Sequence, residues 1–102
     1  EQNARSRAFD AAVSELNGRE SLIWADIKIS KTGYTDDSVV RGVLNARPPE
    51  ATAGVGPWLG DDYTWAAAAN VGNNPLTFKT TTTITLTRTT STSTGPATWR
   101  RP

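Results

Sequence analysis

Hydrophobic residues in the first thirty positions recur with the period of an α-helix. They stand three, four or seven residues apart, at Phe9, Ala12, Val13, Leu16, Ile23, Trp24 and Ile27. This spacing places them on one face of a helix. Gly18 disfavours a helix interior by about 1 kcal/mol relative to alanine, and it suggests a bend or the close approach of another backbone. Because the apolar pattern resumes after Gly18, we predict one amphipathic helix over residues 1–30.

The last forty residues alternate in polarity with the period of a β-strand. Odd positions in 63–71 form one apolar series, and even positions in 76–88 form another, so each series predicts a strand with one buried face. Gly72-Asn73-Asn74-Pro75 predicts a turn between them and therefore a hairpin. Ser91 to Gly95 predicts a second turn, and residues 97–101 predict a short final strand that carries Trp99. The threonine-rich stretch suits a half-exposed strand, although such a composition is also typical of a disordered, O-glycosylated stalk.

The middle of the chain is predicted to be irregular. Pro48-Pro49 and Gly54-Val55-Gly56-Pro57 interrupt regular structure. One or two helical turns around residues 39–44 are predicted, with Asp36 or Asp37 as the N-cap. The whole pattern predicts one α+β domain over residues 1–102. Its parts are a long N-terminal helix (1–30), a connecting region (31–62) and a C-terminal antiparallel sheet (63–102) on which the helix packs.

Composition excludes several classes of function. The chain has 11 basic and 10 acidic residues, and this balance argues against a nucleic-acid-binding protein, which usually has a basic excess. It contains no histidine or cysteine, which removes Ser-His-Asp and Cys-His catalysis and most zinc, haem and copper sites. The segment around Gly54 lacks the Gly-Lys-Ser/Thr ending of a phosphate-binding loop. We therefore expect no enzymatic activity and no organic cofactor.

Two local features could bind a ligand. Asp61 and Asp62 offer carboxylates of the kind that calcium prefers, although aspartates that cap a helix or form a turn are the simpler interpretation because no EF-hand spacing is present. Trp58, between Pro57 and Leu59, is a candidate surface-binding aromatic. The alternative for this tryptophan is core packing between the helix and the sheet.

The chain resembles the soluble part of type IV pilins and type II secretion pseudopilins. The resemblance lies in residues 2–20, which look like the second half of a pilin-type helix, and in Gly60-Asp61-Asp62-Tyr63-Thr64-Trp65 followed by a Gly/Asn turn, a threonine-rich strand and a terminal tryptophan. The apolar first half of such a helix, the prepilin processing site and the cysteine pair of many pilins do not occur in the sequence. We expect the chain to be a truncated or processed product whose membrane-anchoring segment preceded Glu1.

The resemblance implies a structural role as a subunit of a periplasmic or extracellular filament. The implied partners are copies of the chain or related pilins and the inner-membrane assembly machinery, and the implied location is the cell envelope. It implies subunit contacts near the start of the helix, at Arg5, Arg7, Phe9, Asp10 and Val13, and it adds weight to calcium at Asp61 and Asp62. The alternative function is a free secreted β-rich binding or adhesin module, whose gene would encode a conventional signal peptide before Glu1.

Overall fold

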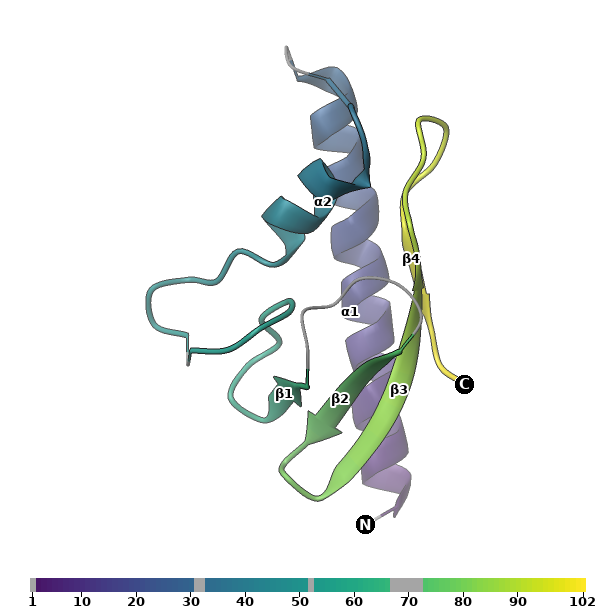
Figure 1. Ribbon diagram of the computed structural model, residues 1–102. Helices are drawn as coiled ribbons and strands as arrows, with labels where there is room; N and C mark the ends of the chain where they lie inside the picture. The colour runs from purple at the N-terminus through teal and green to yellow at the C-terminus, as the bar shows by residue number, and fades with distance from the viewer. Residues whose placement is uncertain (1, 31–32, 52, 67–72) are drawn as a thin grey trace.

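A computed structural model describes residues 2–30, 33–51, 53–66 and 73–102 of the chain (Figure 1). The elements in chain order are α1 (Gln2–Ile29), α2 (Asp37–Leu44), β1 (Tyr63–Trp65), β2 (Asn74–Phe78), β3 (Thr82–Thr89) and β4 (Thr98–Arg100). The strands form one antiparallel sheet in the order β1-β2-β3-β4. Helix α1 packs along one face of this sheet, and α2 packs against α1. The predicted α+β architecture is confirmed.

Helix α1 is continuous through Gly18. Its 28 residues correspond to a length of about 42 Å at 1.5 Å per residue, close to the 46 Å long axis of the molecule. A Cβ atom added at Gly18 would meet nothing within 4 Å. The suggested bend or close backbone approach at this glycine is therefore wrong, since Gly18 faces open space on the side of α1 away from the sheet.

The predicted short helix and its cap are confirmed in α2. Asp36 is the N-cap, and its carboxylate accepts a hydrogen bond from the Ser38 N–H (2.9 Å). Hydrogen bonds from the hydroxyl and N–H of Ser38 hold the pKa of Asp36 below its usual range. Val40 and Leu44 are buried against the rest of the molecule, so this cap fixes where an apolar turn packs onto α1.

The series over residues 76–88, predicted as the second strand of a hairpin, is in fact two strands joined by a tight turn. Lys79 and Thr80 adopt φ angles of 53° and 61°, and the Thr81 N–H donates to the Phe78 carbonyl (3.1 Å). The alternation of polarity does not reveal this turn, because even-numbered residues of β2 pair with even-numbered residues of β3 and the apolar series continues through it. Positive φ is also uncommon for residues other than glycine, so the sequence gives little warning of the turn.

The turn predicted at residues 72–75 is also corrected. Asn74 and Pro75 belong to β2, where the Asn74 side chain donates to the Leu86 carbonyl (3.2 Å) and the Pro75 carbonyl accepts from the Ala66 N–H (3.1 Å). The pairing of β1 with β2 confirms an antiparallel neighbour for the Tyr63–Trp65 strand. The rest of that predicted strand, with Ala67, Ala69 and Val71, lies outside the described residues.

The core lies between α1 and the inward face of the sheet. Its apolar members share almost complete burial and come from both helices and all four strands: Phe9, Ala12, Leu16, Leu44, Trp65, Leu76, Leu86 and Trp99. Aromatic contacts connect the layers, with 5.4 Å between the ring centroids of Trp65 and Trp99. The odd-numbered threonines of β3 occupy the opposite face of an ordered strand, as the hydroxyl contact between Thr77 and Thr83 (2.7 Å) shows. The predicted ordered strand is confirmed for this tract.

Candidate functional site

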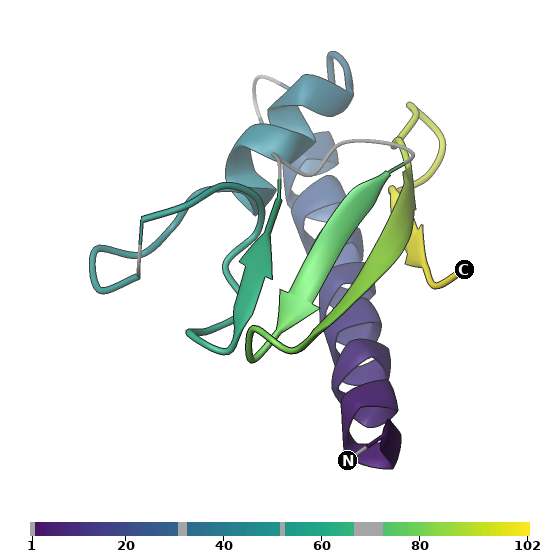
Figure 2. The same ribbon diagram turned by 60° about the horizontal axis from the view of Figure 1, so that its bottom comes forward.

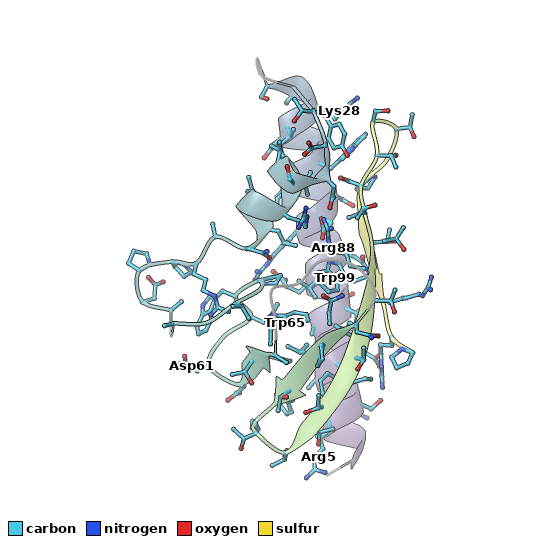
Figure 3. All side chains as sticks on the ribbon, in the orientation of Figure 1. Arg5, Lys28, Asp61, Trp65, Arg88 and Trp99 are labelled. Carbon is cyan, nitrogen blue, oxygen red and sulfur yellow. The ribbon has the colours of Figure 1, made fainter. Side chains whose placement is uncertain are left out.

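A charged side chain is buried at the centre of the molecule. Arg88 is on the inward face of β3, and its side chain has no exposed surface. Its Nε donates to Glu20 of α1 (2.8 Å), and its two terminal nitrogens donate to Asp37 of α2 (2.7 and 3.0 Å). Figure 3 shows Arg88 and the Trp99 side chain between α1 and the sheet. One guanidinium therefore joins a strand to both helices.

Both carboxylates of this cluster have further donors. Glu20 accepts from the indole N–H of Trp99 (2.7 Å), and Asp37 accepts from the N–H and hydroxyl of Ser91 (2.9 and 2.6 Å). Burial alone would raise the pKa of Asp37, but hydrogen bonds from Arg88 and Ser91 outweigh burial and lower that pKa to about 2. Burial acts to lower the pKa of Arg88, and its hydrogen bonds to the two carboxylates overcome that effect and raise it.

The ion pairs of this cluster fix the positions of three charged side chains. The arginine stays protonated at any physiological pH, and the charged atoms of Arg88, Glu20 and Asp37 are directed at one another within the fold. A geometry of this kind fixes how elements sit relative to each other. We therefore interpret the cluster as the clamp that sets the position of α1 and α2 on the sheet.

The residues predicted for subunit contacts are not on one surface. Phe9 is 2% exposed and lies in the core, and Val13 packs partly buried against that core. Asp10 accepts from Arg101 (2.8 Å). Arg7 is exposed, whereas the side chain of Arg5 lines a groove beside the sheet. The sheet of the same subunit covers the Phe9 ring, so we leave Phe9 out of any proposed contact between subunits. A role for the other residues in assembly stays a prediction.

The face of α1 that points away from the sheet carries small side chains at heptad spacing. Its small members are all exposed and fall into the two series Ala4, Ala11, Gly18, Ala25 and Ser14, Ser21, the second of which is flanked at the same spacing by the exposed charged residues Arg7 and Lys28. Leu22 (66% exposed) and Ile29 (83% exposed) lie beside the C-terminal part of this series. We call the six small residues, together with Leu22 and Ile29, the outward face of α1. Interpretation of the sequence missed this face because it followed the apolar stripe, although the seven-residue repeat of small residues was visible.

Trp58 lies at the edge of a hollow of about 320 Å³. The ring is partly buried, and the guanidinium of Arg47 lies 5.4 Å from its centroid. The carbonyl of Trp58 accepts from Arg19 of α1 (2.7 Å). The tryptophan is therefore attached to α1 through its backbone carbonyl, and it lines the hollow. A surface-binding role for Trp58 stays a prediction.

Asp61 and Asp62 are exposed in the turn that leads into β1. Figure 3 shows Asp61 at the margin of the molecule, away from the Arg88 cluster. Within the described ranges, no group of three or more acidic, histidine or cysteine side chains is arranged to hold a metal ion. Calcium at this turn would need backbone oxygens and water to complete its usual six to eight ligands, and its binding stays a prediction.

Comparison with known proteins places this chain in no family. No protein-family model, no curated protein and no solved structure matches it. In the described part of the chain, neither helix combines the length and apolar character needed to cross a bilayer. What the geometry defines is an α+β fold whose longest helix has one face in the core and one face exposed.

Proposed function

We propose that this chain is the head domain of a pilin-like filament subunit and acts as a structural protein rather than an enzyme. The observation that carries this proposal is the outward face of α1. A helix that served only to cover the sheet would need one apolar face and a charged opposite face. The outward face instead has alanine, serine and glycine at heptad spacing next to two large exposed aliphatic residues, and charged residues flank its serine series only at the two ends, at Arg7 and Lys28.

Small side chains on a helix allow a second helix to approach closely. The distance between packed helix axes depends on the side chains at the contact, and a heptad repeat keeps one seam in contact along the whole length of two helices. Leu22 and Ile29 would lose water-exposed apolar surface in such a contact, at about 25 cal/mol per Å² buried. The outward face therefore supports assembly of subunits through α1.

The proposed full-length protein is a type IV pilin or a type II secretion pseudopilin in the cell envelope. It would be anchored in the inner membrane through an apolar continuation of α1, and the assembly machinery there would transfer it into a filament. The second candidate is a free secreted binding or adhesin module. The observation that favours it is the hollow beside Trp58, where an aromatic ring and Arg47 meet.

A substitution at Gly18 tests assembly separately from folding. Gly18→Leu places a bulky side chain on the outward face, where no described residue lies within 4 Å of an added Cβ atom. We expect the variant head to fold normally and the full-length variant to form no filaments in its native host, as judged by electron microscopy and shear preparation. The matched control, Thr89→Leu, enlarges an exposed side chain on β3 and should assemble normally. Normal filaments from Gly18→Leu would refute assembly through this face.

The gene region before the codon for Glu1 provides an independent test. A prepilin-type processing site followed by about 20 apolar residues would support the filament subunit. A conventional signal peptide that ends at Glu1 would refute it and favour the free binding module.

A further inference from the structure

Among the residues that the structure describes, the first half of β3 has a strand neighbour on one side only. β2 pairs with residues 82–86 of β3, whereas β4 pairs with residues 87–89. Figure 2 shows β4 beside only the C-terminal half of β3. The register of β4 would place Pro102 opposite Thr85, and proline has no N–H to donate to a ladder. The described part of the chain therefore leaves an open sheet edge at residues 82–85.

The hydrogen-bonding groups at this edge can be assigned from the pairing of β4. The N–H and carbonyl of Trp99 bond to the Asn17 side chain (2.7 and 3.0 Å), so they point away from β3. Arg88 and Trp99 are therefore a non-hydrogen-bonded pair, and the pattern alternates along the strand. By this alternation, Thr83 and Thr85 direct their N–H and carbonyl groups toward the open side. These four groups are the ones that an added strand would use.

A groove of about 640 Å³ runs along the same edge. Its apolar lining includes Phe9 of α1 and Ile84 of β3, and its charged lining is Arg5 and Arg101. Arg101 donates to Asp10, while Arg5 forms no ion pair with any residue that the structure describes. The groove thus combines strand-pairing groups, an apolar floor and a positive charge without a partner among the described residues.

We propose that this groove binds an extended acidic segment of another protein, which pairs with β3 as an additional strand. Backbone hydrogen bonds to Thr83 and Thr85 would supply affinity, and an apolar side chain of the segment would lie over Ile84. The arginines select for acidic residues. A second copy paired edge to edge would bring like-charged arginine rims together, which disfavours self-pairing. This inference is independent of assembly through α1, because it uses a different surface.

The test uses a fluorescein-labelled hexapeptide with glutamate at both ends and alternating valine and threonine between them. Fluorescence anisotropy measures its binding to the 102-residue chain at low ionic strength. We expect saturable binding that weakens as salt is added, because exposed charges are screened. A peptide with lysine at both ends and a glutamate peptide with N-methylated inner residues are both expected to bind at least about tenfold more weakly.

Two pairs of variants locate the site. Thr83→Pro removes an N–H on the open side of β3 without removing a bond to β2, and it should abolish binding. Its control, Thr83→Val, keeps the N–H and should bind normally. Arg5→Glu should weaken binding about fivefold or more. Its control, Arg7→Glu, makes the same change of charge on another side of α1 and should have little effect.

Several outcomes would overturn the proposal. They are absence of binding to the wild-type chain at about 1 mM protein, equal binding of the N-methylated peptide, or equal binding by a Thr83→Pro variant whose circular dichroism is native. The N-methylated peptide keeps the test valid should Thr83→Pro fail to fold. A wild-type dimer in sedimentation that Thr83→Pro converts to a monomer would assign the edge to a second copy and would also refute the acidic partner.

Discussion

Removing the buried guanidinium should test whether the Arg88 cluster holds the fold together. In the Arg88→Met variant, a flexible apolar side chain of similar length replaces the arginine on β3. Glu20 has no exposed side-chain surface. Within this cluster, its carboxylate would keep only one hydrogen-bond donor, the indole N–H of Trp99. Asp37 is 12% exposed and would keep its bonds from Ser91. The principal cost therefore falls on Glu20.

The expected loss follows from the type of interaction. Breaking a buried ion pair by removing one partner costs about 3–5 kcal/mol, because the other charge stays buried without compensation. A domain of this size is stable by about 5–15 kcal/mol. Arg88→Met should therefore remain foldable but lose a large fraction of its stability. Replacing both partners, in Glu20→Gln with Arg88→Met, should recover about 1–3 kcal/mol of that loss because no buried charge is left on α1.

Urea unfolding at pH 7, followed by tryptophan fluorescence, measures each free energy of unfolding. The four proteins of the cycle are the wild type, the two single variants and the double variant. Arg41→Met is the matched control, because Arg41 also contacts Asp37 (3.2 Å) but has 34% of its side chain exposed. Its loss should stay within about 1 kcal/mol. A loss below about 1 kcal/mol for Arg88→Met, or a double variant less stable than Arg88→Met, would refute the clamp interpretation.

Three further predictions concern acid, a glycine and calcium. The pKa of Asp37 falls from 3.8 to about 2 on folding, so its contribution of ~2 kcal/mol to the free energy of unfolding should be present above pH 4 and lost as the pH falls toward 2. The free energy of unfolding of Asp37→Asn should therefore depend less on pH between 4 and 2. An equal pH dependence in the variant and the wild type would contradict the assignment. Gly56→Ala should lower the melting temperature markedly, since Gly56 has φ 76° and an added Cβ would lie 2.6 Å from the Trp65 ring; an unchanged melting curve would refute this. Calcium at about 10 mM should raise the melting temperature and should fail to do so in Asp62→Asn; no rise in the wild type would dispose of the calcium prediction.

The elements that sequence predicted well are those with a local physical cause. The helix over residues 1–30 follows from a stripe of apolar residues, and the cap at Asp36 follows from a short carboxylate that can reach a free N–H. The turn at Lys79 and Thr80 could not be predicted in this way. Neither residue favours positive φ, and the turn exists because β2 and β3 both place apolar residues on α1.

The buried charge cluster had a signal that was not interpreted. Glu20 stands four residues after Leu16 and three before Ile23, so it occupies the apolar stripe of the helix. Arg88 shares its parity with Leu86 and therefore points inward with it. Opposite charges at inward positions of two elements predict a buried pair, because a single buried charge is too costly to leave unpaired. The third member, Asp37, depends on how α2 packs and had no such signal.

Under the proposed function, the two faces of α1 would separate folding from assembly, and this separation makes the proposal open to a strict test. Residues that hold the head together lie on the inward face, from Phe9 through Leu16 to Glu20, so their substitution would change both properties at once. Gly18 lies on the outward face, and leucine there should stabilise the isolated helix by about 0.8 kcal/mol through its better helix propensity. A subunit that becomes more stable while it loses assembly cannot be explained by misfolding. That pair of results would assign assembly to the outward face of α1, whereas gain of stability with normal assembly would place subunit contacts elsewhere.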